Sequence, residues 1–246
     1  MGKPLGQPWV GDDGTVFFAE KPIVDGLLVW DSETAVTVSG EERTVSGNGL
    51  PDHPTGDYPA DMSSEAWQYD PNPNTISAAD FSYAIPADPA IADEPECLPM
   101  GPIGVALNGA LFFNALDADN RDAVANEVFD ACEGHPAPGG QYHYHHGSPC
   151  FDQGLPDEHS LLVGHALDGF GIYGPRDAGG VLMTNDDLDE CHGHTGPIPT
   201  GNSSTIDVYH YHLNEQFPYT LGCFRGVANL PAGPRGASLP QEDVIE

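Results

Sequence analysis

Lysine is almost absent from this chain of 246 residues. Only Lys3 and Lys21 are present, and seven basic side chains in total face 38 acidic ones, so the formal net charge is −31. A field of this sign repels nucleic acid and anionic lipid, and we expect neither as a partner. The acidic residues are scattered along the chain rather than gathered in a tail. This pattern predicts adaptation to molar salt, where screening removes most of the self-repulsion.

Long apolar runs and familiar catalytic signatures are missing as well. No run of about 18 apolar residues occurs, so we predict no membrane insertion. Residues 1–4 lead straight into polar turn residues, and no signal peptide is expected in this chain. Residues 169–174 fit the glycine pattern of dinucleotide sites, but Pro175 follows in place of a helix. We therefore predict no nucleotide cofactor and name no catalytic residue.

Glycine and proline are abundant, with 30 and 24 copies, which indicates many turns and few long helices. Residues 34–38 and 81–85 alternate as strands do, and residues 15–18 and 27–30 follow Asp-Gly turn signals. Residues 120–130 hold apolar side chains near helical spacing and could form a short helix. The fold class predicted is mainly β and loop-rich, with little helix.

An internal repeat organises the second half of the chain. Residues 103–109 match residues 163–169 at an offset of 60, and the Cys-x-x-His turn of residues 132–135 returns at 191–194. The sequence Tyr-His-Tyr-His occurs at residues 142–145 (the first ribbon) and again at 209–212 (the second ribbon). Two units of this size, about 98–151 and 158–224, most simply pack as a pseudo-twofold pair. We therefore predict a compact antiparallel β domain built on an internal duplication.

Three regions are expected along the chain. Residues 1–43 would form an N-terminal β extension that docks to neighbours, and residues 44–226 the domain that holds both repeats. Residues 227–246 contain Pro231, Pro234 and Pro240 and would form an extended C-terminal arm.

The histidines of the two ribbons are the best candidates for a site. Alternate residues of a strand share one face and stand about 6–7 Å apart, so both rings of a His-x-His pair can reach one ion. If the pseudo-twofold brings the ribbons together, their four histidines can converge with the two of the Cys-x-x-His turns. The predicted metal ligands are His143, His145, His210, His212, His135 and His194. Imidazole suits transition metals, and we favour zinc or copper.

Two alternatives stand beside this metal site. Each His-x-His pair could lie on a solvated face, or its histidines could be satisfied by backbone and water. The remaining histidines without a repeat partner are interpreted as structural or surface residues. They are His146, His159, His165 and His192.

The five cysteines allow two interpretations. Two Cys-x-x-His pairs could close one structural zinc site with Cys132 and Cys191. We favour disulfides, because Cys150 and Cys223 repeat as faithfully as the first pair. The possible pairings are Cys132–Cys150 with Cys191–Cys223, or crossed versions, and each leaves Cys97 unpaired. A disulfide that closes a loop of such a length would stabilise the fold by about 3 kcal/mol.

Several uncommon blocks in order resemble the YHYH-domain proteins. They are residues 48–53, 72–74, 139–145, 166–174, 188–194 and 217–223, so the resemblance covers roughly residues 44–226. It implies that His53, in a rigid turn, joins the six histidines above on family motif positions. Members of this family are usually exported, or they are structural and tail-fibre proteins of some marine viruses, and the resemblance implies one of these settings for this chain. Residues 198–207 depart from the family as a longer loop, and the resemblance names no reaction.

Two functions follow from these observations. The first is a metal-binding or disulfide-stapled β module that serves as a structural or attachment component of a halophilic virion, or of a cell surface. Its partners would be other virion or surface subunits, including a second copy of the chain. The second is a secreted metal-dependent enzyme, hydrolytic or oxidative. In it, Asp130, Asp189 or Glu190 would act as a general base or would hydrogen-bond to a metal ligand. Because no catalytic motif occurs, we favour the first.

Overall fold

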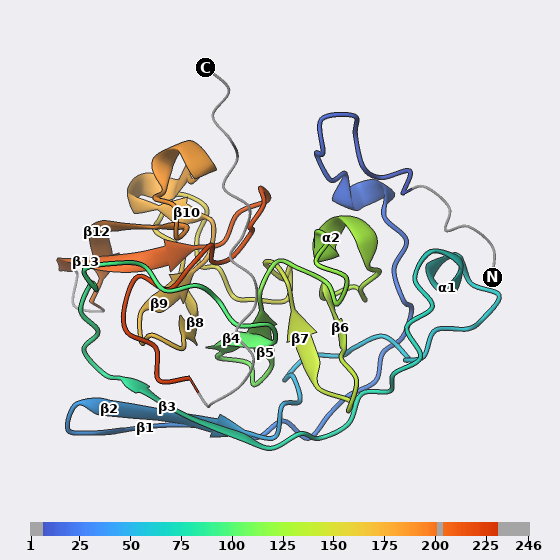
Figure 1. The fold of residues 1–246 in the computed structure, drawn as a ribbon, viewed down its shortest axis with the longest axis horizontal. Helices are drawn as coiled ribbons and strands as arrows, with labels where there is room; N and C mark the ends of the chain where they lie inside the picture. The colour runs from blue at the N-terminus through green and yellow to red at the C-terminus, as the bar shows by residue number, and fades with distance from the viewer. Residues whose placement is uncertain (1–6, 201–203, 231–246) are drawn as a thin grey trace.

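The computed structural model describes residues 7–200 and 204–230 (Figure 1). Short strands dominate them, as predicted. The helical segments are η1 (Phe18–Glu20), α1 (Glu65–Tyr69), α2 (Ala123–Asn126), η2 (Ala178–Gly180) and η3 (Asn185–Asp187). The strands are β1 (Thr34–Ser39), β2 (Glu42–Gly47), β3 (Phe81–Pro86), β4 (Pro102–Ala106), β5 (Leu111–Phe113), β6 (Gly134–Pro136), β7 (Tyr142–Tyr144), β8 (Leu162–Ala166), β9 (Gly171–Tyr173), β10 (Arg176–Asp177), β11 (Val181–Leu182), β12 (Gly193–Pro199) and β13 (Thr205–His212).

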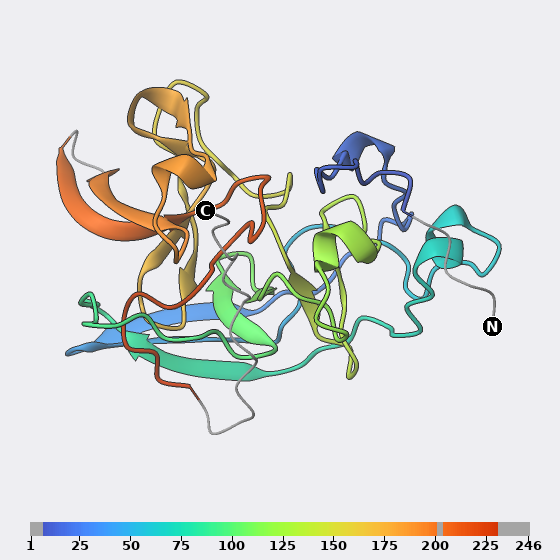
Figure 2. The same cartoon turned by 45° about the horizontal axis from the view of Figure 1, so that its top comes forward.

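An eight-stranded sheet in the order β12-β13-β9-β8-β4-β5-β7-β6 forms the centre of the protein. A three-stranded antiparallel sheet, β1-β2-β3, runs along one side of it, at the bottom of Figure 1. Turning the view keeps β12 and β13 at one end of the large sheet and β6 and β7 toward the other (Figure 2). The two ribbons therefore belong to strand pairs at opposite edges of one sheet.

The two halves of the large sheet have corresponding strand orders. Counting outward from the central antiparallel pair β4–β8, one half runs β4-β5-β7-β6 and the other runs β8-β9-β13-β12. In each half the hairpin strand β5 or β9 pairs parallel with its ribbon, and the outermost strand pairs antiparallel. That the halves arose by duplication stays a prediction.

Tight turns close the two hairpins at matching glycines. Gly109 and Gly169 have φ angles of +96° and +95°, which other residues rarely adopt. A Cβ at Gly109 would also approach the carbonyl oxygen of Leu50, and one at Gly169 would approach that of Pro86. Glycine is therefore required where the turns pack against the N-terminal part of the chain.

The turn before β6 is stabilised by a buried carboxylate. Asp130 accepts hydrogen bonds from the backbone N–H of Cys132 at 2.9 Å and of Gly134 at 3.3 Å, and Glu133 takes a φ of +61°. The hydroxyl of Tyr142 donates to both oxygens of the same carboxylate, at 2.9 and 3.0 Å. A Cβ at Gly134 would overlap the ring of Tyr142, so the glycine allows this close approach.

The turn before β12 repeats this arrangement. Asp189 accepts from the backbone of Cys191 and Gly193 at 3.0 and 3.1 Å and from the hydroxyl of Tyr209 at 3.0 Å, while His192 takes a φ of +72°. Two of the three carboxylates named as possible partners of a metal site, Asp130 and Asp189, thus lie on the tyrosine face of the ribbons.

The predicted disulfides are present in the repeat-symmetric pairing. Cys132 bonds Cys150 and Cys191 bonds Cys223, while Cys97 is free and exposed. A zinc site built from Cys132 and Cys191 is therefore wrong, because neither thiolate is available. Two disulfides indicate an oxidising environment outside the cytosol.

The N-terminal segment forms fewer strands than its turn signals indicate. Residues 15–18 contribute one isolated bridge, Val10–Val16, and then enter η1, while residues 27–30 contribute the bridge Leu28–Thr55. Trp9 is fully buried, and its indole N–H donates to the carbonyl oxygen of Ala125 at 3.0 Å. This part of the chain is therefore held by its tertiary contacts.

Most of the predicted C-terminal arm, residues 231–246, lies outside the described residues. In the described part, no helix is long and apolar enough to cross a membrane.

Candidate metal centres

The ribbons place tyrosine and histidine on opposite faces, as the alternation predicts. Tyr142 and Tyr144 are fully buried, with ring centroids 5.5 Å apart. His143 and His145 face the other way, and each is only 3% exposed. Because both faces are buried, the ribbon histidines are not on a solvated face.

Three imidazoles meet in the first half of the sheet. The Nε2 atom of His143 lies 3.0 Å from that of His135 and 3.1 Å from that of His145. His135 and His143 are directly opposed in the pairing of β6 with β7. A carboxylate oxygen, Oε2 of Glu127, lies 3.5 Å from Nε2 of His135 and 3.4 Å from Nε2 of His145. These four residues are called the first centre.

Three imidazoles meet in the same way in the second half. The Nε2 atoms of His194, His210 and His212 lie 3.0 to 3.2 Å from one another. Nε2 of His159 lies 3.3 Å from that of His210, and Oδ1 of Asp177 lies 3.6 Å from Nε2 of His159. These five residues are called the second centre.

Backbone carbonyls determine which ring nitrogen carries the proton. Nδ1 of His143 faces the carbonyl oxygen of Gln141 at 3.2 Å, and Nδ1 of His145 faces that of Asn114. A carbonyl only accepts, so Nδ1–H is the donor and Nε2 presents a lone pair toward the centre.

The second centre is oriented in the same way. Nδ1 of His210 faces the carbonyl oxygen of Val208 at 3.0 Å, and Nδ1 of His212 faces that of Gly174 at 2.7 Å. The ribbon histidines therefore turn two lone pairs into each centre.

Burial keeps the four ribbon histidines and His135 neutral. It lowers the pKa of His145 and of His210 to about 4 and that of His212 to about 3, with further lowering by neighbouring imidazoles. The pKa values of His135 and His143 also lie well below the usual range, chiefly because of burial. The ribbon histidines are therefore not protonated on both ring nitrogens at neutral pH, and a cation is the species that would satisfy their Nε2 lone pairs.

Each centre also contains a carboxylate oxygen without a hydrogen bond. Oε2 of Glu127 and Oδ1 of Asp177 are buried and have no hydrogen-bond partner. Burial raises the pKa of Glu127 to about 8. An unpaired buried carboxylate oxygen is costly unless an ion completes its surroundings.

The spacing fits a transition-metal ion. With bonds of about 2.0–2.1 Å, nitrogen–nitrogen distances of 3.0 and 3.2 Å correspond to angles of about 94° and 103° at a shared ion. The chemistry of the donors, imidazole with a carboxylate, suits the same class of metals. Each centre could hold one ion.

The expectation that all six histidines converge is wrong. Five strand spacings, roughly 24 Å, separate β7 from β13 along the sheet. The reason is that the hairpins, not the ribbons, meet at the pair β4–β8. Each ribbon therefore forms its centre with the turn histidine of its own half.

His53 lies on the tyrosine face and not with the six histidines. Its Nε2 contacts the hydroxyl of Tyr144, and its Nδ1 lies 2.9 Å from the carbonyl oxygen of Pro54. Its ring also approaches Cys132 and Cys150, whose sulfurs are bonded to each other.

Three members of the centres were missed by sequence reasoning. His159 was interpreted as a structural or surface residue because it lacks a repeat partner, and Pro99 lies at the offset of 60. Glu127 and Asp177 are two of 38 acidic residues, and nothing in their local pattern distinguishes them. Only the tertiary structure brings them to the imidazoles.

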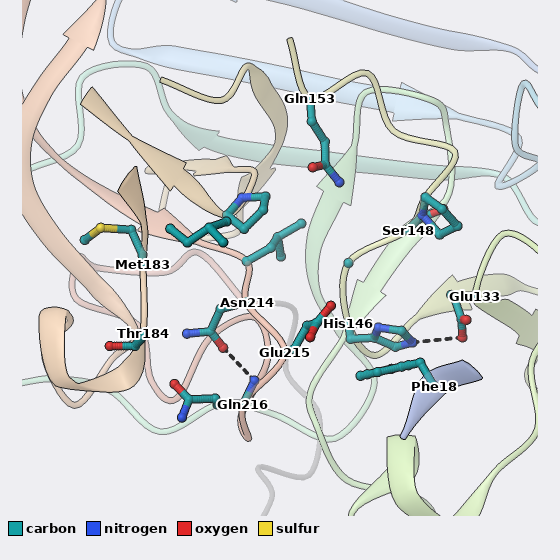
Figure 3. Close-up of a pocket in the computed structure, with 15 residues that line it drawn as sticks. Phe18, Glu133, His146, Ser148, Gln153, Met183, Thr184, Asn214, Glu215 and Gln216 are labelled. Carbon is teal, nitrogen blue, oxygen red and sulfur yellow. Dashed lines mark hydrogen bonds and ion pairs between the residues drawn. The ribbon is translucent and has the colours of Figure 1, made fainter. Parts of the chain in front are cut away.

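A cavity of about 540 Å³ lies where the chain leaves the two ribbons (Figure 3). His146 and Glu133, with Nε2 and Oε2 3.2 Å apart, form one wall, and Met183 and Asn214 lie across from them. The lining residues, all in the described part of the chain, include none of the histidines of the two centres. Phe129 packs against the rings of both His145 and His146, with centroids 6.1 and 5.5 Å away.

Comparison with known proteins agrees with part of the resemblance. No curated protein and no solved structure matches this chain significantly. The matching family segment contains every residue of the first centre, together with His159 and Asp177, and ends before His194. Over residues 82–181 the chain matches the model of the family described as YHYH protein, which confirms the resemblance for that segment.

Proposed function

We propose that this protein is a disulfide-bonded β module that binds two transition-metal ions, one in each half of its large sheet. The observation that carries the proposal is the convergence of three imidazole Nε2 atoms in each half, 3.0 to 3.2 Å apart, with the ribbon histidines presenting lone pairs. The unpaired carboxylate oxygen in each centre supports it.

Metal content of protein purified without a histidine tag tests the proposal. We expect two ions per chain, and one ion after His143→Ala or His210→Ala, because each change removes a ligand from one centre. His165→Gln is the matched control, since His165 lies on β8 outside both centres. Fewer than one ion per wild-type chain, or unchanged binding in both alanine variants, would refute metal binding.

We further propose that the module serves as a structural or attachment component at a virion or cell surface in a high-salt environment. The disulfides, the net charge of −31 and the lack of a catalytic motif support this role. The partners would be other surface subunits, including a second copy of the chain. Light scattering in 0.1 and 2 M NaCl tests self-association, and a monomer under both conditions would leave only unlike subunits as partners.

A metal-dependent enzyme is the second candidate. It needs a ligand position open to a cavity, and the cavity of Figure 3 begins one residue beyond His145 and His212. Phe129 packs against the rings of both His145 and the cavity residue His146, and this packing favours the binding module.

A further inference from the structure

Segments from both halves of the protein form the walls of the cavity in Figure 3. One wall contains His146, the residue after the first ribbon, and the facing wall contains Asn214, two residues after the second ribbon. Its volume of about 540 Å³ lies within the range of about 300–1,000 Å³ that is typical of sites for small organic ligands. The cavity is therefore large enough to hold a ligand of its own.

Hydrogen bonds and a disulfide hold both walls in place. The hydroxyl of Ser148 donates to the carbonyl oxygen of Cys132 at 2.6 Å, and Cys132 is bonded to Cys150. On the facing wall, Nδ2 of Asn214 donates to Oδ1 of Asn185 at 3.1 Å. Ligand sites are usually largely formed before the ligand arrives, and this cavity meets that condition.

The cavity offers apolar surface that is still in contact with solvent. Leu182 is 65% exposed and Phe18 is half-exposed, while Met183 and Leu213 line the same cavity and are buried. The ring of Phe18 packs against that of His146, with centroids 5.0 Å apart. Because covering apolar surface is favourable in water, a ligand with an apolar body would be held here.

The charged groups of the lining are carboxylates. Among the described residues that line the cavity, Glu133 and Glu215 are acidic and none is lysine or arginine. Nε2 of His146 faces Oε2 of Glu133 at 3.2 Å. Glu215 is exposed, and its side chain points toward the wall that contains His146 (Figure 3). In a protein with a net charge of −31, such a cavity attracts a cation and repels an anion.

We propose that this cavity binds a small organic cation that carries an ammonium group on an apolar body. The apolar body would lie against Phe18, Leu182 and Met183, and the ammonium group would lie near Glu215. An aromatic ring such as that of Phe18 attracts a cation as well. The proposal is independent of metal binding, because the described residues that line the cavity include no histidine of either centre.

Calorimetric titration with three matched probes tests the proposal. Phenethylammonium has both features, whereas 2-phenylethanol has only the apolar body and methylammonium only the charge. We expect phenethylammonium to bind at one site per chain, about 5-fold more tightly than 2-phenylethanol and more tightly still than methylammonium. Repeating the titration in 1 M NaCl screens the general attraction of cations to an acidic surface, and one-site binding should persist there because the apolar contacts remain.

Methionine methyl groups locate the bound probe. Met183 lines the cavity, whereas Met62 and Met100 do not. In protein labelled with ¹³C at the methionine methyl groups, phenethylammonium should shift the nuclear magnetic resonance signal of Met183 and leave those of Met62 and Met100 in place. The variant Met183→Leu assigns the signal.

A pair of matched variants tests the role of charge in the cavity. Glu215→Gln should weaken the binding of phenethylammonium about 3- to 5-fold and leave that of 2-phenylethanol unchanged, because the side chain keeps its size and loses its charge. Glu41→Gln makes the same charge change in the turn between β1 and β2, outside the cavity, and should alter neither affinity.

Three outcomes would overturn the inference. Equal affinity for phenethylammonium and 2-phenylethanol would show that the cavity does not select a cation. Shifts at all three methionines, or equal weakening by Glu41→Gln and Glu215→Gln, would mean general attraction to the acidic surface. None of these outcomes changes the expected metal content, so this inference and the proposed function fail separately.

Discussion

On one face of each ribbon, a tyrosine hydroxyl stabilises the turn that precedes β6 or β12. That turn places a histidine of the metal centre, which lies on the opposite face. Tyr142 donates to Asp130, and the same carboxylate accepts the backbone N–H groups of the turn that leads to His135. Tyr209 and Asp189 do the same ahead of His194. The position of each turn histidine therefore depends on a tyrosine that cannot reach the centre itself.

Replacing either tyrosine by phenylalanine tests this dependence. Tyr142→Phe should lower the free energy of unfolding by about 1–2 kcal/mol, because a buried carboxylate loses a donor that water cannot replace. Tyr209→Phe should behave alike, and Tyr83→Phe on the small sheet is the control. Urea unfolding measures the change. Equal stability of Tyr142→Phe and the control would show that the backbone donors alone satisfy Asp130.

Lys21 is a second buried group with a measurable consequence. Its Nζ donates to the carbonyl oxygen of Val124 at 2.6 Å and lies 3.9 Å above the ring of Phe129. Burial lowers its pKa from 10.5 to about 8, against the raising effect of nearby acids such as Glu133.

The pH dependence of stability follows from this lowered pKa. Between pH 8 and 10 the unfolded chain binds more protons at Lys21 than the folded chain, so stability rises with pH there. Relative to Lys21→Met, the wild type should gain about 2 kcal/mol across this window. Urea unfolding at several pH values measures it. Parallel profiles for the two proteins would show that Lys21 is not the cause.

At the scale of single residues, the sequence predicts the ribbon histidines and not their carboxylate partners. His143 and His145 are predictable because strand alternation is a local rule. Glu127 and Asp177 are not, because Glu127 follows the short helix α2 and Asp177 lies on the two-residue strand β10, and the places of both elements depend on tertiary packing. His159 illustrates a limit of repeat reasoning, since a residue without a counterpart can still belong to the site of its own half.

At the scale of elements, each disulfide joins the turn before β6 or β12 to a segment that follows the ribbon of the same half. Cys132–Cys150 spans 18 residues and Cys191–Cys223 spans 32. On the chain-entropy model, replacing the first pair by alanine should cost about 3 kcal/mol and the second pair about 4 kcal/mol. Urea unfolding without reductant measures both costs. A larger loss from the shorter loop would mean that packing, rather than chain entropy, determines the order.

A thiol count gives an independent check on the same pairing. Unfolded protein without reductant should show one reactive thiol per chain, that of Cys97. The variant Cys97→Ala should show none. A wild-type count above one would mean that a disulfide is incomplete.

The strands β1 and β3 were predictable from alternation, and the order of strands in the large sheet was not. The repeat indicates two similar units but not which strands meet between them. The parallel pairs β5–β7 and β9–β13 join segments separated by long loops, and no local pattern encodes such pairs. The N-terminal segment differs from its strand signals because burial of Trp9 and single bridges determine its path.

At the scale of the whole molecule, the net charge of −31 opposes folding at low ionic strength. The Debye length falls from about 30 Å at 0.01 M salt to about 8 Å at 0.15 M, so most of the repulsion is screened within this range. We therefore expect the urea midpoint to rise with NaCl, most steeply below 0.15 M. KCl should give the same rise. A midpoint that is independent of salt would remove the charge argument for a high-salt habitat.

The outermost strands of the large sheet, β6 and β12, each carry one histidine of a centre, and the neighbouring ribbon carries two. An ion in either centre would therefore tie an edge strand to its neighbour. Moving β6 along β7 by one residue would turn His135 toward the tyrosines and leave the ion short of a ligand. Bound metal would thus fix the strand register at both edges, and it would oppose displacement of β6 or β12 by a strand of another chain.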